Sequence, residues 1–241
     1  MTLPLWVLEL AATFWKEAGT VEPFPRNLRG PIARTLPVAV IYLPRLCVAG
    51  VTTWLRRNRL DSPFVEADRR IRACLVAHRG AGFIFIDGAD SEDEQRFSLA
   101  HELAHFLRDY WQPRRLACDR LGPSILEVFD GRRSATPEER IDAVLAGLPI
   151  GFHVHFMDRD RTGAVVSGEV AQAEEDADRL AYELLAPADV VLTKSSHESG
   201  LVNLLHDTYG LPQTQAVAYA ALLEAPQATV VPVLRRLGLI S

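Results

Sequence analysis

The spacing of apolar residues along the chain predicts helices in its N-terminal part. Residues 1 to 20 are expected to form a helix that packs on the body of the protein. Between Leu43 and Arg57 apolar residues recur at helical spacing, and the whole stretch from Pro37 to Leu55 is predicted to be buried helix. Because Pro44 interrupts this stretch before it reaches the roughly 18 apolar residues of a spanning helix, no membrane segment is expected.

Two short apolar runs further along the chain predict strands. The first, IRACLVA, begins at Ile71, and the second, FIFID, begins at Phe83. The linker between them, HRGAG, contains two glycines, which suit a tight hairpin turn. We therefore expect a small antiparallel sheet in this region.

A helix is predicted directly after the hairpin. Ser91 and Glu94 have the spacing of a capping box, in which each side chain bonds the backbone of the other residue. The apolar run that follows should carry the helix to about Tyr110.

The remainder of the chain is predicted to be mainly helical after a long irregular stretch. Residues 112 to 170 are rich in Arg, Gly and Pro and are expected to be mostly loop, with one helix and one strand. A strong helix is expected from 171 to 186, because Pro187 stops it. A helix pair interrupted by Gly210 should cover residues 198 to 224.

Composition and charge narrow the classes of function. The chain has 241 residues, of which 48% are hydrophobic, so it can bury a core without a structural metal. A net charge of -5 and a pI near 5.8 give no general attraction to phosphate. The three cysteines form no CxxC pair, and no basic leader precedes the first apolar stretch, so we expect a cytoplasmic protein with reduced thiols.

The chemistry of the chain centres on the HExxH arrangement from His101 to His105. Residues four apart on a helix differ by only about 40° in direction, so both imidazoles can bind one ion. Zinc accepts imidazole nitrogen readily, although two histidines and a carboxylate can also hold iron or manganese. Glu102, about 100° around the helix from His101, would serve as general base. A chance pattern on a solvated helix is disfavoured, because the surrounding residues are apolar.

A catalytic zinc needs a third protein ligand, which the acidic helix EEDADRLAYELLAP can supply. Glu174 and Asp178 lie four apart on one face, so Glu174 could bind the metal while Asp178 accepts a hydrogen bond from a ligand imidazole. Glu175 is the rival third ligand. These acids could also simply favour the positive end of a helix dipole.

Two further features bear on how a peptide could be cleaved. An oxyanion donor is required, and His153, His155 and Tyr182 are candidates by chemistry alone. The run from Phe83 to Asp87 could pair with an extended substrate backbone, or it could be an ordinary interior strand.

The segments RFSLAHELAHFL at 96 to 107 and ExxADxLAxxLLxP at 174 to 187 closely resemble the ImmA/IrrE family of metallopeptidases. The resemblance implies a gluzincin-like peptidase that binds Zn²⁺ through His101, His105 and Glu174, with Glu102 catalytic. It also implies a protein substrate of the helix-turn-helix repressor type, or an antitoxin. The family often has Asn and Phe where this chain has Asp178 and Leu180.

Together these features predict an α+β, zincin-like fold, in which a small antiparallel sheet carries the HExxH helix and the rest is mostly helical. We expect an N-terminal helical segment over 1–35, a metallopeptidase domain over 36–195, and a C-terminal helical segment over 196–241. The last of these resembles a helix-turn-helix. Its second helix, QTQAVAYAALLEA, has no Lys or Arg, so packing on the body is expected rather than DNA binding.

Two functions remain open on the sequence. The first is a regulatory zinc endopeptidase, which the intact HExxH favours. The alternative is a catalytically silent binding or regulatory protein on the same fold.

Overall fold

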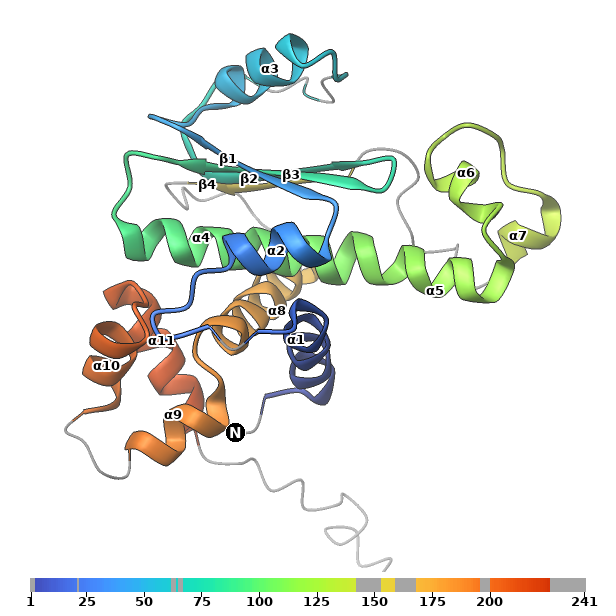
Figure 1. The fold of residues 1–241 in the computed structure, drawn as a ribbon. Coiled ribbons are helices and arrows are strands. Elements are labelled where there is room, and N and C mark those ends of the chain that lie inside the picture. The colour runs from blue at the N-terminus through green and yellow to red at the C-terminus, as the bar shows by residue number, and fades with distance from the viewer. Residues whose placement is uncertain are drawn as a thin grey trace, which may run out of the picture.

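Four strands form a mixed sheet, with the order β1-β3-β2-β4 (Figure 1). They are β1 (Val38–Leu43), β2 (Ile71–His78), β3 (Ala81–Asp87) and β4 (His153–Asp158). β2 pairs antiparallel with β3 and β4, whereas β1 pairs parallel with β3. The computed structural model describes residues 3–20, 22–61, 64, 67–141, 153–158, 168–195 and 200–225.

The predicted hairpin is confirmed by β2 and β3. His78 faces Ala81 across the pair, so Arg79 and Gly80 form a two-residue turn. Both have positive φ, 48° for Arg79 and 81° for Gly80, as the turns that match the twist of a hairpin require.

The prediction for Pro37 to Leu55 is wrong in its first half, where β1 replaces the expected buried helix. The run VAVIYL is rich in β-branched and aromatic residues, which favour a strand that pairs with β3. Because β1 runs parallel to β3, the sheet is mixed rather than purely antiparallel. β3 lies between β1 and β2, so it is an interior strand and has no free edge for a substrate.

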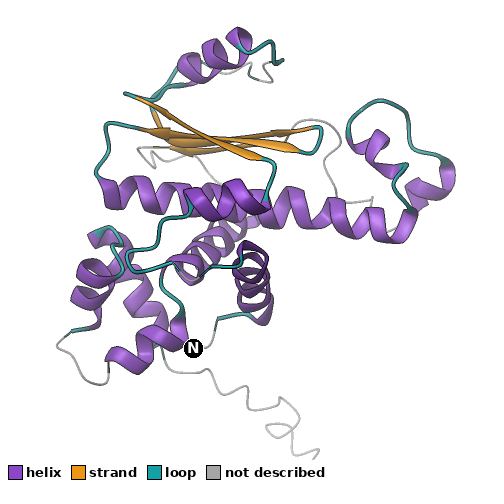
Figure 2. Ribbon diagram, in the orientation of Figure 1, coloured by secondary structure: helices purple, strands orange, loops and turns teal. Residues whose placement is uncertain are grey.

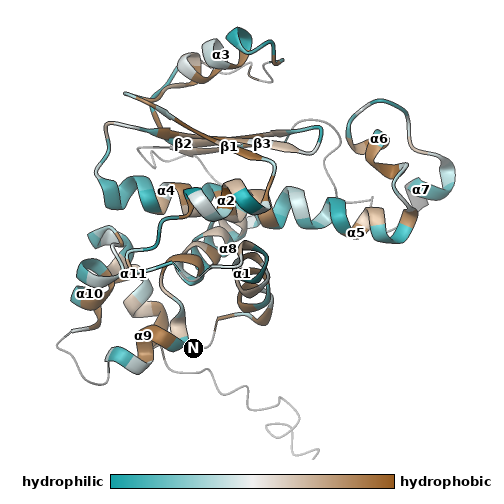
Figure 3. Ribbon diagram, in the orientation of Figure 1, coloured by the Kyte–Doolittle hydropathy of each residue, from teal (hydrophilic) through white to brown (hydrophobic). Residues whose placement is uncertain are grey.

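Helices cover both faces of the sheet (Figure 2). On one face lies α3 (Val48–Arg57), the predicted helix of this region. Val51 and Leu55 of α3 pack with Cys74, Val76 and Phe85 of the sheet in a small buried cluster. The strand β1 is apolar along its length (Figure 3). The helix α4 (Glu92–His105), which lies on the other face of the sheet from α3, has a hydrophilic first turn.

A long helical rod covers the second face. It consists of α4 (Glu92–His105), the π-helical η1 (Phe106–Trp111) and α5 (Gln112–Leu121), so it runs past the predicted end at Tyr110. The helix begins after Ser91 as predicted, but Ser91 makes no capping hydrogen bond with its side chain. The capping box does not form, because the Glu94 carboxylate pairs with Arg72 of β2.

Further helices pack beneath this rod and bury a large apolar core (Figure 1). The predicted helices at the N-terminus, at 171 to 186 and at 198 to 224 are confirmed, and α6 and α7 add helix to the stretch from 112 to 170 beyond the one expected there. Residues 142–152 and 159–167 of that stretch, and 226–241 of the last predicted segment, lie outside the described residues. The helices of this core are α1 (Leu5–Ala18), α2 (Arg29–Thr35), α8 (Gly168–Leu185), α9 (Ala188–Ser195), α10 (Leu201–Asn203), the π-helical η2 (Leu204–Thr208) and α11 (Gln213–Glu224). The helices α6 (Ile125–Phe129) and α7 (Pro137–Ile141) lie instead at the end of α5, where α6 packs with α5 in a small separate cluster (Figure 1).

The helix α11 packs on the body, as its lack of basic residues predicts. Tyr219 is fully buried and stacks on Tyr182 of α8, with ring centroids 4.5 Å apart. Its hydroxyl donates a hydrogen bond to the carbonyl oxygen of Ala186. Over the described ranges, no helix is both long and apolar enough to cross a bilayer.

Candidate metal centre

The helix α4 places His101 and His105 on its face toward α8, one turn apart. Their ring centroids are 4.9 Å apart, and the two residues are only 2% and 3% exposed. Burial follows from the apolar residues that surround them on α4 and pack against the sheet and α8. Two imidazoles in such a setting need a polar partner, because an unpaired polar group in a core is costly.

Glu174 reaches this pair from α8. One carboxylate oxygen lies 3.4 Å from Nε2 of His101, and the other lies 3.6 Å from Nε2 of His105. Glu175 does not share this position: its side chain is 62% exposed and pairs with Arg179 at 3.1 Å. The structure thus brings Glu174, and not its neighbour, to the two histidines.

The third imidazole at this point is His155, which comes from β4. Its Nε2 lies 2.8 Å from Oε1 of Glu174, and its ring stacks on that of His105 with centroids 3.7 Å apart. The donor atoms of His101, His105, His155 and Glu174 all lie within 4.8 Å of one another. We call these four residues the metal group.

Carboxylates hold the outer nitrogens of the two α4 histidines. Nδ1 of His101 lies 2.8 Å from Asp178, and Nδ1 of His105 lies 2.8 Å from Asp109. This leaves both Nε2 atoms facing inward, the arrangement found around metal-ligating imidazoles. Sequence analysis missed Asp109, although its position four residues after His105 on one helix face could have indicated it.

The inward nitrogens provide a test of whether an ion fits. Nε2 of His101 and Nε2 of His105 are buried and make no hydrogen bond with any described residue. Buried polar atoms are nearly always satisfied, so two such nitrogens beside a carboxylate fit a bound cation.

Glu102 lies next to the metal group and is fully buried. Its Oε2 lies 3.0 Å from Nδ1 of His155. Its other oxygen, Oε1, is buried without a hydrogen-bond partner among the described residues. A carboxylate with one unengaged oxygen in a buried site can accept a proton there.

The electrostatics of the site favour positive charge at its centre. Burial opposes the protonation of His101, but its contacts with Asp178 and Glu174 outweigh it and raise its pKa to about 9. Burial likewise opposes ionisation of Glu174, yet the contacts with His101 and His155 bring its pKa well below the ordinary value. For His105 burial prevails and lowers the pKa to about 4.

Two of the candidate oxyanion donors stand outside the metal group. His153 points from the same face of β4 as His155, since the two are separated by one residue, and its ring centroid lies 6.3 Å from that of Tyr110. Tyr182 donates a hydrogen bond from its hydroxyl to Gln215 of α11. Its ring packs between those of Phe97 and Tyr219.

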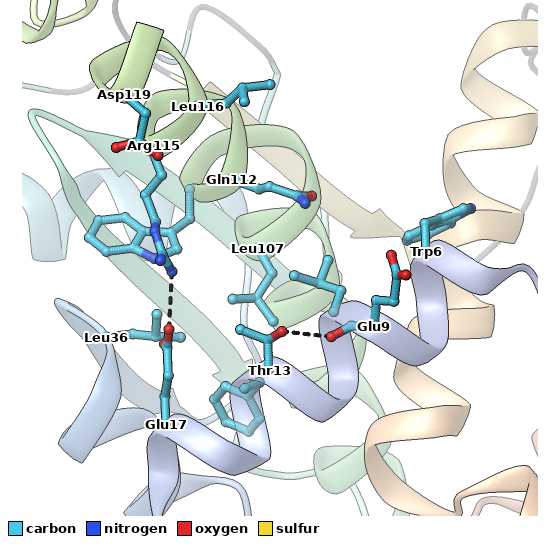
Figure 4. Close-up of a pocket in the computed structure, with 13 residues that line it drawn as sticks. Trp6, Glu9, Thr13, Glu17, Leu36, Leu107, Gln112, Arg115, Leu116 and Asp119 are labelled. Carbon is cyan, nitrogen blue, oxygen red and sulfur yellow. Dashed lines mark hydrogen bonds and ion pairs between the residues drawn. The ribbon is translucent and has the colours of Figure 1, made fainter. Parts of the chain in front are cut away.

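A separate groove of about 490 Å³ lies between α1, η1 and α5 (Figure 4). Trp6, Leu107 and Trp111 line it, and an ion pair between Glu17 and Arg115 crosses one end. No member of the metal group lines this groove. Leu107 and Trp111 of η1 line this groove, whereas Asp109 of η1 pairs with His105. The groove and the metal site thus use different side chains of the same element.

An HExxH helix laid on a small mixed sheet, with imidazoles and a carboxylate gathered to hold an ion, is an arrangement of the metallopeptidase type. Residues 63–122 match the family model described as the IrrE N-terminal-like domain, Peptidase_M78, which confirms the resemblance to the ImmA/IrrE family. The matched residues include the whole HExxH segment but end before His155 and Glu174. No curated protein and no solved structure matches the chain.

Proposed function

We propose that this protein is a zinc-dependent endopeptidase. In this proposal His101, His105 and Glu174 bind the zinc, Asp178 and Asp109 orient the two imidazoles, and Glu102 is the catalytic base. The observation that supports it best is the pair of buried, unbonded Nε2 atoms beside Glu174. The match to a peptidase family over the HExxH segment supports it independently.

A zinc ion bound by these residues supplies Lewis acidity and acidifies water near it. The chain supplies the proton transfers: Oε1 of Glu102 takes a proton from the attacking water and later returns it to the leaving amine. Apolar residues of α4 and α8 bury His101, Glu102 and His105, which strengthens the electrostatic interactions of these side chains.

The substrate in this proposal is a protein, a helix-turn-helix repressor or an antitoxin. The family resemblance supports this choice. We place the catalytic body at residues 36–195 and the protein in the cytoplasm, which accords with the absence of a disulfide at Cys47, Cys74 and Cys118.

The experiment combines metal analysis with proteolysis. Purified protein should contain one zinc per chain, and it should cleave a repressor encoded beside its own gene. Glu102→Gln should keep the zinc and lose cleavage, because an amide cannot accept the proton. Undiminished cleavage by this variant would remove the proposed base, and tight substrate binding without any cleavage by wild type would favour the catalytically silent binding protein.

A further inference from the structure

We infer that His155 is a fourth, displaceable ligand of the same ion and that it holds the site closed in the resting protein. This inference rests on the proposed function, and it adds a regulatory step to it. The relevant feature is the arrival of a third imidazole, from a different element, at the point where His101, His105 and Glu174 meet.

The distances from the Glu174 carboxylate to the three imidazoles are close to those of ligands around one small ion. Zinc bonds to nitrogen and oxygen are about 2.0–2.1 Å long, so donors at the corners of a tetrahedron lie roughly 3.3 Å apart. The Glu174 oxygens lie 3.4 Å from Nε2 of His101, 3.6 Å from that of His105 and 2.8 Å from that of His155. His155 is therefore at least as close to the carboxylate as the two HExxH histidines are.

All three imidazoles have the same kind of hydrogen-bond partner at Nδ1. Each has a carboxylate at Nδ1: Asp178 for His101, Asp109 for His105, and Glu102 for His155. A carboxylate at Nδ1 directs Nε2 of the same ring inward and increases its basicity as a ligand. His155 is thus oriented in the way that the two expected ligands are.

Glu102 gives this arrangement its functional meaning. With His155 bound to the ion, its Nδ1–H donates to Oε2 of Glu102 at 3.0 Å, so one of the two oxygens of the base is engaged. Four protein ligands also leave zinc no position for water, which is the property of a structural site rather than a catalytic one. One movement of His155 would therefore open the coordination position and free the second oxygen of Glu102 together.

The position of His155 allows such a movement. It lies on β4, which pairs only with β2 at the edge of the described sheet. Its side chain is 14% exposed, compared with 3% for each of the α4 histidines. A substrate or partner that enters from this edge meets His155 before it meets the two α4 histidines.

The test counts imidazoles on the zinc-loaded, full-length protein by X-ray absorption at the zinc edge. We expect three in wild type, two in His155→Ala, and three in His153→Ala, the matched control on the same strand face. Two imidazoles in wild type would overturn the inference while leaving the proposed function intact. A protein that binds no zinc would overturn both. If His155→Ala fails to fold, the wild-type count alone decides.

Two further measurements test the closed state. Zinc affinity, measured by competition with a chelator, should fall at least tenfold in His155→Ala, because an entire ligand is lost where even an outer partner contributes about 10–100-fold. Cobalt-substituted His155→Ala should change its visible spectrum on addition of azide, whereas wild type should not. An equal response of wild type to azide would show an open position and overturn the inference.

Cleavage at saturating zinc separates this role from that of an oxyanion donor. A closing ligand predicts faster cleavage by His155→Ala than by wild type. Slower cleavage, with the imidazole count unchanged by the substitution, would make His155 an oxyanion donor and overturn the inference.

Discussion

Nδ1 of His101 lies 2.8 Å from Oδ1 of Asp178, across the contact between α4 and α8. Asp178 sits one turn beyond Glu174 on α8, so the helix that supplies a proposed ligand also orients one of its partners. The geometry of the metal group thus depends on how these two helices pack.

Removing the Asp178 carboxylate should weaken metal binding without unfolding the protein. Asp178→Asn is expected to lower zinc affinity about 10–100-fold, because the amide no longer holds His101 with its Nε2 inward as strongly. Competition with a chelator measures the loss. Glu169→Gln, at the exposed start of the same helix, is the control and should not change the affinity.

The two neighbouring glutamates should differ sharply. Glu174→Gln is expected to cost more zinc affinity than the ~10–100-fold of an outer partner, since it removes an anionic ligand. Glu175→Gln should bind zinc as wild type does, because its side chain is exposed and pairs with Arg179. Equal effects of the two substitutions on zinc content would contradict the assignment of the third ligand.

A third prediction concerns the contact between the rod and the sheet. At Gly82 of β3 a Cβ atom would lie 2.8 Å from the Phe106 ring and 3.1 Å from Val38, closer than packed atoms allow. Gly82→Ala should therefore destabilise the fold by about 1–3 kcal/mol in urea unfolding. Gly168→Ala, where no atom lies within 4 Å, should not destabilise it, and Phe106→Leu should reduce the cost of Gly82→Ala.

A fourth prediction concerns pH and Glu183, a buried carboxylate away from the metal group. Burial raises its pKa above the ordinary value of 4.5, against hydrogen bonding from the backbone of Ala188 and the nearby charge of Arg26. The folded state therefore binds this proton more tightly than the unfolded state, so the carboxylate costs stability as pH rises above about 4.5.

The variant Glu183→Gln keeps the hydrogen bond from Ala188 and lacks the titrating group. Its stability relative to wild type should rise between pH 4 and pH 7 in urea unfolding. Glu175→Gln, at an exposed position of α8, is the control for the substitution itself. A constant difference for Glu183→Gln would show that its carboxylate has no raised pKa.

The part of the site that lies within one helix could be predicted from the sequence, whereas the contacts between distant elements could not. Helical periodicity requires that His101 and His105 face the same way, and in the structure their ring centroids lie 4.9 Å apart. The choice between Glu174 and Glu175 depends on the rotation of α8 against α4, which adjacent residues on a helix do not reveal. His155 could be named as a candidate, but its strand pairs across a long stretch of chain, and alternation alone does not say which face meets α4.

The fold shows the same division between local and long-range information. The hairpin of β2 and β3 could be predicted, since its turn residues and apolar runs are adjacent in sequence. β1 could not, because a short apolar run near Pro44 suits a buried helix or a buried strand equally until its parallel partner is known.

The metal group draws its donors from α4, β4 and α8, which are far apart along the chain. An ion held there would tie a helix, an edge strand and a second helix at a single point, and so would close two long loops of polypeptide at once. A bound ion would then cross-link the three elements, and the metal-bound protein should resist digestion by unrelated proteases longer than the metal-free protein.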